Sequence, residues 1–219
     1  NTLNAFKIEF SKYFPSILEG YRTLGSVGKK NLSGDIDLAI SSKTLFNDDG
    51  TPKLNELNID EKQYKDVFDK YKSKSRSATE EMLMLRSVLF FIAKRINEYS
   101  KDLTVDDKGS SAGTLFCKFP QFDDKGKKTN DFVQIDLNFG NLDWLTFSYY
   151  SDVYKDNVKG LHRTQLMLSL FSEAGYIFSH NYGVKNKETG QIVATNPNEA
   201  ISLLNKIYGF SINTDILSN

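Results

Sequence analysis

The stretch Thr23–Ile40, TLGSVGKKNLSGDIDLAI, predicts how the rest of the chain is organised. A short apolar segment enters a turn at Gly25 and Ser26, and a second segment then alternates Asp35 and Asp37 with apolar residues. Because successive side chains of a strand point to opposite faces, we expect both carboxylates on one face. Neighbouring carboxylates repel each other, so the pair indicates either a solvated strand face or a cation site.

A third carboxylate occupies a similar position in the later stretch Phe132–Phe139, FVQIDLNF. Its strict alternation predicts a strand with Ile135 and Leu137 facing the core and Asp136 on the polar face. A carboxylate at mid-strand is either solvated at a sheet face or part of a charged site. Three carboxylates on the polar faces of two strands are what a two-metal phosphoryl-transfer site requires.

The glycine-serine turn adds groups that suit a phosphate. Gly25 lets a phosphate approach the backbone closely, and Ser26 offers a hydroxyl beside the backbone N–H groups. Lys29 and Lys30 follow on the same turn and could neutralise a triphosphate. The spacing differs from a Walker P-loop, which requires Gly-x4-Gly-Lys-Ser/Thr.

The composition predicts a globular protein of the reduced cytoplasm. The chain has 219 residues, of which 39% are hydrophobic, enough for a substantial core. Its formal net charge of zero excludes a bulk electrostatic binder of nucleic acid. A single cysteine, Cys117, excludes an internal disulfide framework and a cysteine zinc cage. No apolar run approaches the roughly 18 residues of a membrane span, so we expect no membrane association.

Hydrophobic periodicity predicts the remaining elements. Helices are predicted at Leu3–Phe14, Asp60–Tyr71, from a Ser77/Glu80 capping box to Tyr99, at His162–Ala174 and from Asn196 to Tyr208. Strands are predicted at Tyr21–Leu24, Asp35–Ile40, Thr114–Phe122, Phe132–Phe139, Tyr176–Ser179, Tyr182–Lys185 and Gln191–Ala194. Residues 41–58 and 103–112 read as loops, and the aromatic stretch Leu142–Tyr150 is predicted to pack under the sheet.

Three short motifs follow one another along the chain: Leu24-Gly25-Ser26, Asp35-Ile36-Asp37-Leu38 and Ile135-Asp136-Leu137. Together they resemble the DNA polymerase beta-type nucleotidyltransferase superfamily. The resemblance implies an α+β fold with a mixed, nucleotidyltransferase-like sheet packed with helices. It implies a nucleoside triphosphate substrate, two Mg²⁺ (or Mn²⁺) ions and release of pyrophosphate. By motif position, Gly25 and Ser26 match the triphosphate-gripping turn, and Asp35, Asp37 and Asp136 match the catalytic metal ligands.

We expect a catalytic core over residues 1–145 and a helix-hairpin-helix region over 146–219. The first helix of that region begins near Lys159 and Arg163, one turn apart. Both could meet the triphosphate, and a solvated helix start is the alternative reading. Basic residues near Lys72 and Lys127 favour a nucleic-acid acceptor, which the zero net charge restrains.

The sequence thus predicts an enzyme that transfers a nucleoside monophosphate to a hydroxyl, with an RNA or DNA end or a nucleotide as the favoured acceptor. A non-catalytic nucleotide- or nucleic-acid-binding module of the same fold is the main alternative. A metal-dependent phosphohydrolase would usually carry histidine ligands, and only His162 and His180 exist, not as a metal-ligand pair. The patterns predict neither the acceptor nor the oligomeric state.

Overall fold

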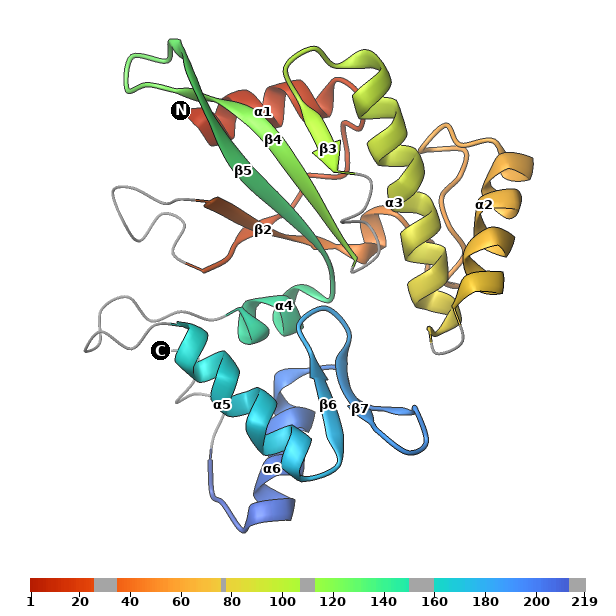
Figure 1. Cartoon of the computed structure of the whole chain (residues 1–219), viewed down its shortest axis with the longest axis vertical. Coiled ribbons are helices and arrows are strands. Elements are labelled where there is room, and N and C mark those ends of the chain that lie inside the picture. Colours follow the sequence, from red (N-terminus) through yellow and green to blue (C-terminus); the bar gives the residue numbers. More distant parts are fainter. Residues whose placement is uncertain (26–34, 76–77, 107–112, 150–159, 213–219) are drawn as a thin grey trace. The chain divides into compact units, whose positions relative to one another are not determined.

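The chain has a mixed α+β fold (Figure 1), as its strand and helix patterns predict. The computed structural model describes residues 1–25, 35–75, 78–106, 113–149 and 160–212. Over these residues it contains six α-helices, a mixed five-stranded sheet and a three-stranded sheet. The chain divides into two compact units, Asn1–Tyr21 with Gly34–Phe139, and Arg22–Ser33 with Gly140–Asn219.

The larger sheet has the strand order β1-β2-β5-β4-β3. Strand β4 runs antiparallel to both β3 and β5, with Phe116 opposite Asp136 and Lys118 opposite Gln134. The first unit therefore contains both strands that carry the three aspartates, β2 and β5. The five strands are β1 (Arg22–Thr23), β2 (Asp35–Ser41), β3 (Thr104–Asp106), β4 (Thr114–Phe122) and β5 (Lys128–Gly140).

One face of this sheet forms the core of the first unit. Alternation along β5 turns Ile135 and Leu137 to that face, and both side chains are fully buried. Helix α1 (Thr2–Ser11) lies along β4 (Figure 1), where Phe6 meets Phe119 edge to face with 5.5 Å between the ring centres. The paired side chains Phe116 and Asp136, Lys118 and Gln134, with Phe132 next along β5, lie on the other face, which we call the open face of the sheet.

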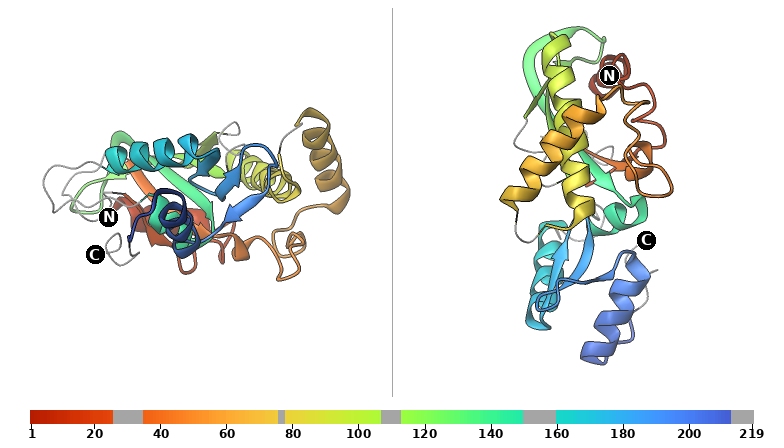
Figure 2. Two further views of the ribbon diagram at one scale, coloured as in Figure 1. Left: turned by 90° about the horizontal axis from the view of Figure 1, so that it is seen from below. Right: turned by 90° about the vertical axis from the view of Figure 1, so that its right-hand side faces the viewer.

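Two helices, α2 (Glu61–Lys74) and α3 (Glu80–Tyr99), lie side by side in the first unit (Figure 2). Helix α3 begins after Thr79, whose hydroxyl accepts a hydrogen bond from the Met82 amide at 3.3 Å. The predicted capping box is therefore wrong, since the N-cap is Thr79; Ser77 itself lies outside the described residues. Thr79 is two residues closer to the helix in sequence than Ser77, and its hydroxyl reaches a free amide of the first turn.

Strand β3 falls in a segment that sequence reasoning assigned to a loop. Its central residue, Val105, exchanges two hydrogen bonds of 2.8 Å with the side chain of Asn97 at the end of α3. A segment of three residues has little propensity to form a strand by itself, so the hydrogen bonds from Asn97 hold its backbone in place. The other predicted loop, 41–58, contains only a short 3-10 helix, Ser42–Thr44, and an isolated bridge between Phe46 and Pro52.

The second unit has its own core of helices around a three-stranded sheet. The aromatic stretch after Gly140 is a helix here, because the Asn141 side chain accepts hydrogen bonds from the Asp143 and Trp144 amides. That helix buries Trp144 and Phe147 in the core of the second unit, together with residues of that unit's own sheet. The elements are α4 (Leu142–Ser148), α5 (Gly160–Glu173), β6 (Tyr176–Ser179), β7 (Gly183–Asn186), β8 (Ile192–Ala194) and α6 (Pro197–Tyr208).

No helix in the described part of the chain combines the length and the apolar character that a membrane span needs. The one cysteine, Cys117, lies on the core face of β4 and is buried. Burial raises the pKa of its thiol far above the ordinary range, and the negative charge of Asp136 adds to the shift. The thiol is therefore protonated and unreactive in the folded protein.

Candidate functional site

Strand β2 presents two of the three aspartates. Asp35 begins the strand and is exposed, whereas Asp37 lies two residues further along the same face and is half-buried. Leu38 and Ile40 point to the opposite face and are fully buried, as the alternation predicts. The buried apolar half of β2 therefore holds the strand in the sheet, while its first residues carry the charges.

Asp136 lies at mid-strand on the open face of β5, and β5 is the neighbour of β2 in the sheet. Its side chain is only 8% exposed, so the carboxylate is largely removed from water. The side-chain amide of Gln134, two residues away on the same face, donates to both carboxylate oxygens at 2.9 and 3.1 Å. This amide supplies the hydrogen bonds that a buried carboxylate requires.

The three carboxylates influence one another electrostatically. The pKa of Asp37 is raised to about 6, first by burial and then by the negative charges of Asp136 and Asp35. The pKa of Asp136 is also raised, chiefly by burial, against the hydrogen bond from Gln134, with Asp35 adding a smaller upward shift. Both charged partners of Asp37 are thus carboxylates. The structure brings together on adjacent strands the three residues that the sequence motifs single out.

The carboxylates suit a divalent metal by their chemistry more than by their geometry. Hard cations such as Mg²⁺ take carboxylate oxygens as ligands, and a cation would relieve the repulsion that raises the pKa of Asp37. Over the described residues, however, no three His, Cys, Asp or Glu side chains converge closely enough to hold an ion. Gln134 donates to both oxygens of Asp136, so a metal ion at that carboxylate would compete with the amide or bind through the remaining lone pairs.

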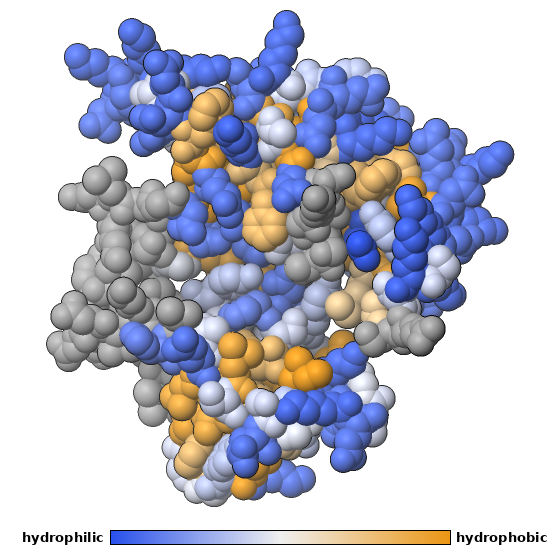
Figure 3. Space-filling model, in the orientation of Figure 1, coloured by the Kyte–Doolittle hydropathy of each residue, from blue (hydrophilic) through white to orange (hydrophobic). Residues whose placement is uncertain are grey.

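A groove of about 420 Å³ lies on the open face over β3, β4 and β5, and its lining includes Gln134, the hydrogen-bond partner of Asp136, but not Asp136 itself. This volume lies within the range of small-molecule sites, and the groove mixes aromatic, basic and amide side chains. Seen from the side of Figure 1, apolar side chains reach the surface among hydrophilic ones over β4 and β5 (Figure 3). The open-face side chains that line it are Thr104, Asp106, Phe116, Lys118, Phe132 and Gln134.

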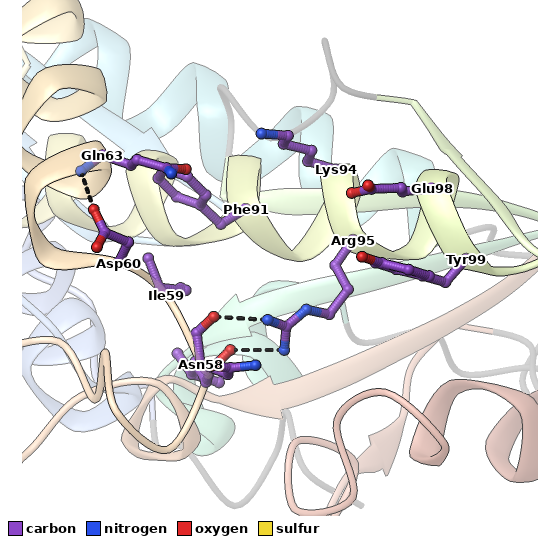
Figure 4. A pocket seen from close by; sticks show the side chains of 10 residues that line it. Asn58, Ile59, Asp60, Gln63, Phe91, Lys94, Arg95, Glu98 and Tyr99 are labelled. Carbon is purple, nitrogen blue, oxygen red and sulfur yellow. Dashed lines mark hydrogen bonds between the residues drawn. The ribbon is translucent and has the colours of Figure 1, made fainter.

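A second cavity, of about 210 Å³, lies beside α3 and has a structural explanation (Figure 4). Arg95 of α3 donates to the backbone oxygens of Leu57 and Asn58 at 3.0 and 2.6 Å. Asn58 has a φ of +52°, so the turn that these bonds hold is in the left-handed region. The guanidinium is used to fix this turn against the helix and is not directed at a ligand.

The predicted triphosphate-binding residues are only partly described. Gly25 has a φ of +58°, the left-handed conformation that glycine adopts without strain, and it belongs to the second unit. Arg163 of α5 also belongs to the second unit, where its guanidinium lies 4.6 Å from the ring centre of Phe147. Ser26, Lys29, Lys30 and Lys159 lie outside the described residues. The triphosphate-binding roles predicted for these six residues stay predictions.

Sequence reasoning missed the groove residues beside Asp136. Alternation predicts Gln134 on the polar face of the strand, but nothing in the sequence says that its amide binds Asp136, the next polar residue along the strand. Phe132 carried the better signal, because it is a large apolar residue at a polar-face position of an alternating strand. Lys118 becomes relevant only through the register of β4 and β5, which places it opposite Gln134.

The resemblance to nucleotidyltransferases therefore rests on the residues themselves. The three motifs occur in order along the sequence, and the two that carry aspartates lie on adjacent strands, with Asp35 and Asp136 acting on the pKa of Asp37. No protein-family model matches this chain, and a search of curated proteins gives no match either.

Proposed function

We propose that this protein is a nucleotidyltransferase, which transfers a nucleoside monophosphate from a nucleoside triphosphate to a hydroxyl group and releases pyrophosphate. One observation carries the proposal: Asp35, Asp37 and Asp136 come from adjacent strands, and the negative charges of Asp136 and Asp35 add to the burial that raises the pKa of Asp37. Structural carboxylates usually have cationic or amide partners, whereas clustered, partly buried carboxylates with perturbed pKa values are typical of functional sites. The acceptor that we favour is an RNA or DNA end or a nucleotide.

The chain's own residues would hold charge and protons at this site. With a pKa of about 6, Asp37 is ionised above neutral pH and is suited to receive a proton close to physiological pH. Gln134 keeps the carboxylate of Asp136 in a fixed orientation on the open face. Two Mg²⁺ or Mn²⁺ ions bound by the three carboxylates would supply the positive charge that stabilises phosphoryl transfer.

The second candidate is a non-catalytic module that binds a nucleotide or nucleic acid. The engagement of both Asp136 oxygens by Gln134 favours it, because a carboxylate satisfied by an amide has no need of a metal. The two candidates differ in one consequence. Removing a carboxylate abolishes transfer by an enzyme, whereas it leaves a binding module's affinity unchanged or raises it by lowering repulsion.

The experiment incubates the full chain with each labelled nucleoside triphosphate, Mg²⁺ or Mn²⁺, and RNA or DNA acceptors, and follows pyrophosphate release and label transfer. We expect transfer that is lost in Asp37→Asn and Asp136→Asn, both of which keep the side-chain shape. Asp124→Asn is the matched control, because Asp124 is exposed at the tip of the β4–β5 hairpin. Transfer that survives both site variants would exclude this site, and absence of transfer with triphosphate still bound would favour the module.

A further inference from the structure

The open-face groove holds an aromatic ring that the fold does not use. Phe132 is 56% exposed, although it is a large apolar side chain on a strand whose polar face it shares with Asp136. Leaving such a ring in water forfeits the free energy that burial would provide. Exposed apolar surface beside polar groups is typical of binding sites.

A cation lies against this ring. The ammonium of Lys118, on the neighbouring strand, is 4.2 Å from the ring centre of Phe132. An aromatic face next to a positive charge offers what a nucleotide needs, a stacking surface for the base and a partner for the phosphate. Among the groove's open-face residues, Lys118 is the only basic side chain, so the positive charge is local to Phe132.

The distance to the aspartates indicates the size of the ligand. Phe132 and Asp136 are four residues apart on β5, which at about 3.3 Å per residue is about 13 Å along the strand. One nucleotide with its hydroxyl at Asp136 does not extend that far, whereas a strand of a few nucleotides does. The groove between them is lined by Gln134, an amide that can bond to bases or sugars.

We propose that this groove binds the 3′ end of a single-stranded nucleic acid, the acceptor of the reaction, and the proposal rests on the function proposed above. A base upstream of the terminal nucleotide stacks on Phe132, its phosphate pairs with Lys118, and the terminal hydroxyl lies at Asp136. The hydroxyl oxygen bonds to the α-phosphorus of the triphosphate as the bond from that phosphorus to the β-phosphate oxygen breaks. Pyrophosphate leaves, and the hydroxyl proton passes to a carboxylate and then to solvent.

The test measures binding of fluorescein-labelled single-stranded RNA and DNA oligonucleotides to the full chain by anisotropy, without triphosphate. A labelled mononucleotide serves as the short ligand. We expect the oligonucleotides to bind and the mononucleotide to bind far more weakly. Phe132→Ala should weaken oligonucleotide binding about tenfold, since base stacking contributes about 1–3 kcal/mol, and Phe132→Trp should restore it. Lys118→Gln should reduce the slope of the logarithm of the binding constant against the logarithm of the salt concentration by the contribution of about one phosphate contact.

The matched controls remove an exposed apolar side chain and an exposed positive charge elsewhere in the first unit. Ile8→Ala removes an exposed apolar side chain of α1, and Lys125→Gln removes an exposed charge at the hairpin tip. We expect both to bind like the unmodified protein. Equal oligonucleotide affinity in Phe132→Ala, full competition by the mononucleotide, or no nucleic-acid binding at all would each overturn the proposal.

The outcomes separate this proposal from the function on which it rests. Label transfer to an acceptor other than nucleic acid, lost in Asp136→Asn but unaffected by Phe132→Ala, would keep the enzyme and overturn the groove assignment. Oligonucleotide binding that depends on Phe132, with no transfer under any condition, would keep the binding surface and overturn both the transferase and the acceptor role.

Discussion

Gln134 donates its side-chain amide to both carboxylate oxygens of Asp136, at 2.9 and 3.1 Å. The two residues are neighbours on the open face of one strand, so the bond is set by the strand geometry and not by a loop. This hydrogen bond lowers the pKa of Asp136, against the burial that raises it. It therefore favours the ionised form of a carboxylate whose pKa burial raises.

The first prediction concerns this amide as a competitor of metal ions. In Gln134→Ala both oxygens of Asp136 lose their donor, so above about pH 8, where the carboxylates are ionised, Mg²⁺ should bind severalfold more tightly. The measurement is the Mg²⁺ concentration at half of the thermal-stability increase. Gln121→Ala on β4, an exposed position, is the control. Weaker Mg²⁺ binding by Gln134→Ala would show that the amide supports the metal and does not compete with it.

The second prediction concerns the free energy of unfolding that the protein loses by placing Asp37 beside the carboxylates of Asp35 and Asp136. Asp37 has a pKa of about 6 in the folded protein against the ordinary 3.8 of an aspartate, so between these values the folded state holds more protons than the unfolded state. The free energy of unfolding therefore falls as the pH rises through this window, and the full loss is present above about pH 6. Asp37→Asn should stabilise the metal-free protein by up to about 3 kcal/mol at neutral pH and by little at about pH 4.

Urea denaturation of the unmodified protein and of Asp37→Asn at both pH values measures this difference. Asp124→Asn removes an exposed charge of the hairpin tip, and we expect the same small effect at both pH values. A gain in Asp37→Asn that does not change with pH would contradict the assignment of the pKa shift.

The third prediction concerns the pH dependence of metal binding. A metal ion and a proton compete for the same carboxylate, and Asp37 takes up its proton at about pH 6. The increase in melting temperature that Mg²⁺ or Mn²⁺ produces should therefore be largest above about pH 7 and should disappear towards about pH 5. In Asp37→Asn the increase should be small at every pH. A thermal-shift titration at several pH values measures both, and a metal effect independent of pH would place the ion elsewhere.

The fourth prediction concerns the start of α3. Thr79→Ala removes the hydroxyl that accepts from the Met82 amide, so the free energy of unfolding should fall by about 1 kcal/mol. Ser77→Ala provides the matched control, because it removes a hydroxyl from the position that the sequence pattern favoured. Chemical denaturation followed by circular dichroism compares the two, and a larger loss in Ser77→Ala would reverse the assignment of the cap.

The strands of the site could be predicted from sequence because their signal is local. Alternation in β2 and β5 fixes which side chains share a face, and the buried positions Leu38, Ile40, Ile135 and Leu137 follow from it. The α+β class follows from the order of strand and helix patterns. These inferences need only the periodicity of neighbouring residues.

The contacts that complete the fold and the site could not be predicted in this way. Strand β3 depends on the side chain of Asn97, and the helical form of α4 depends on the cap at Asn141. The pairing of Lys118 with Phe132 depends on the register of two strands. The contacts of Asn97 and Lys118 join residues whose separation in sequence carries no period, and the cap at Asn141 is a local polar contact. Hydrophobic patterning gives no signal for either kind.

The contact between α1 and the sheet has a consequence for biosynthesis. Thr2 exchanges hydrogen bonds with the backbone of Phe122, 120 residues later, and the Phe6 ring meets Phe119. During translation the Phe6 ring of the first helix cannot meet Phe119 until β4 has left the ribosome, and at about 5–20 residues per second the helix waits about 6–22 seconds for it. Its exposed phenylalanines during that interval make the nascent chain a candidate for chaperone binding, and contacts of such long range slow the completion of the first unit.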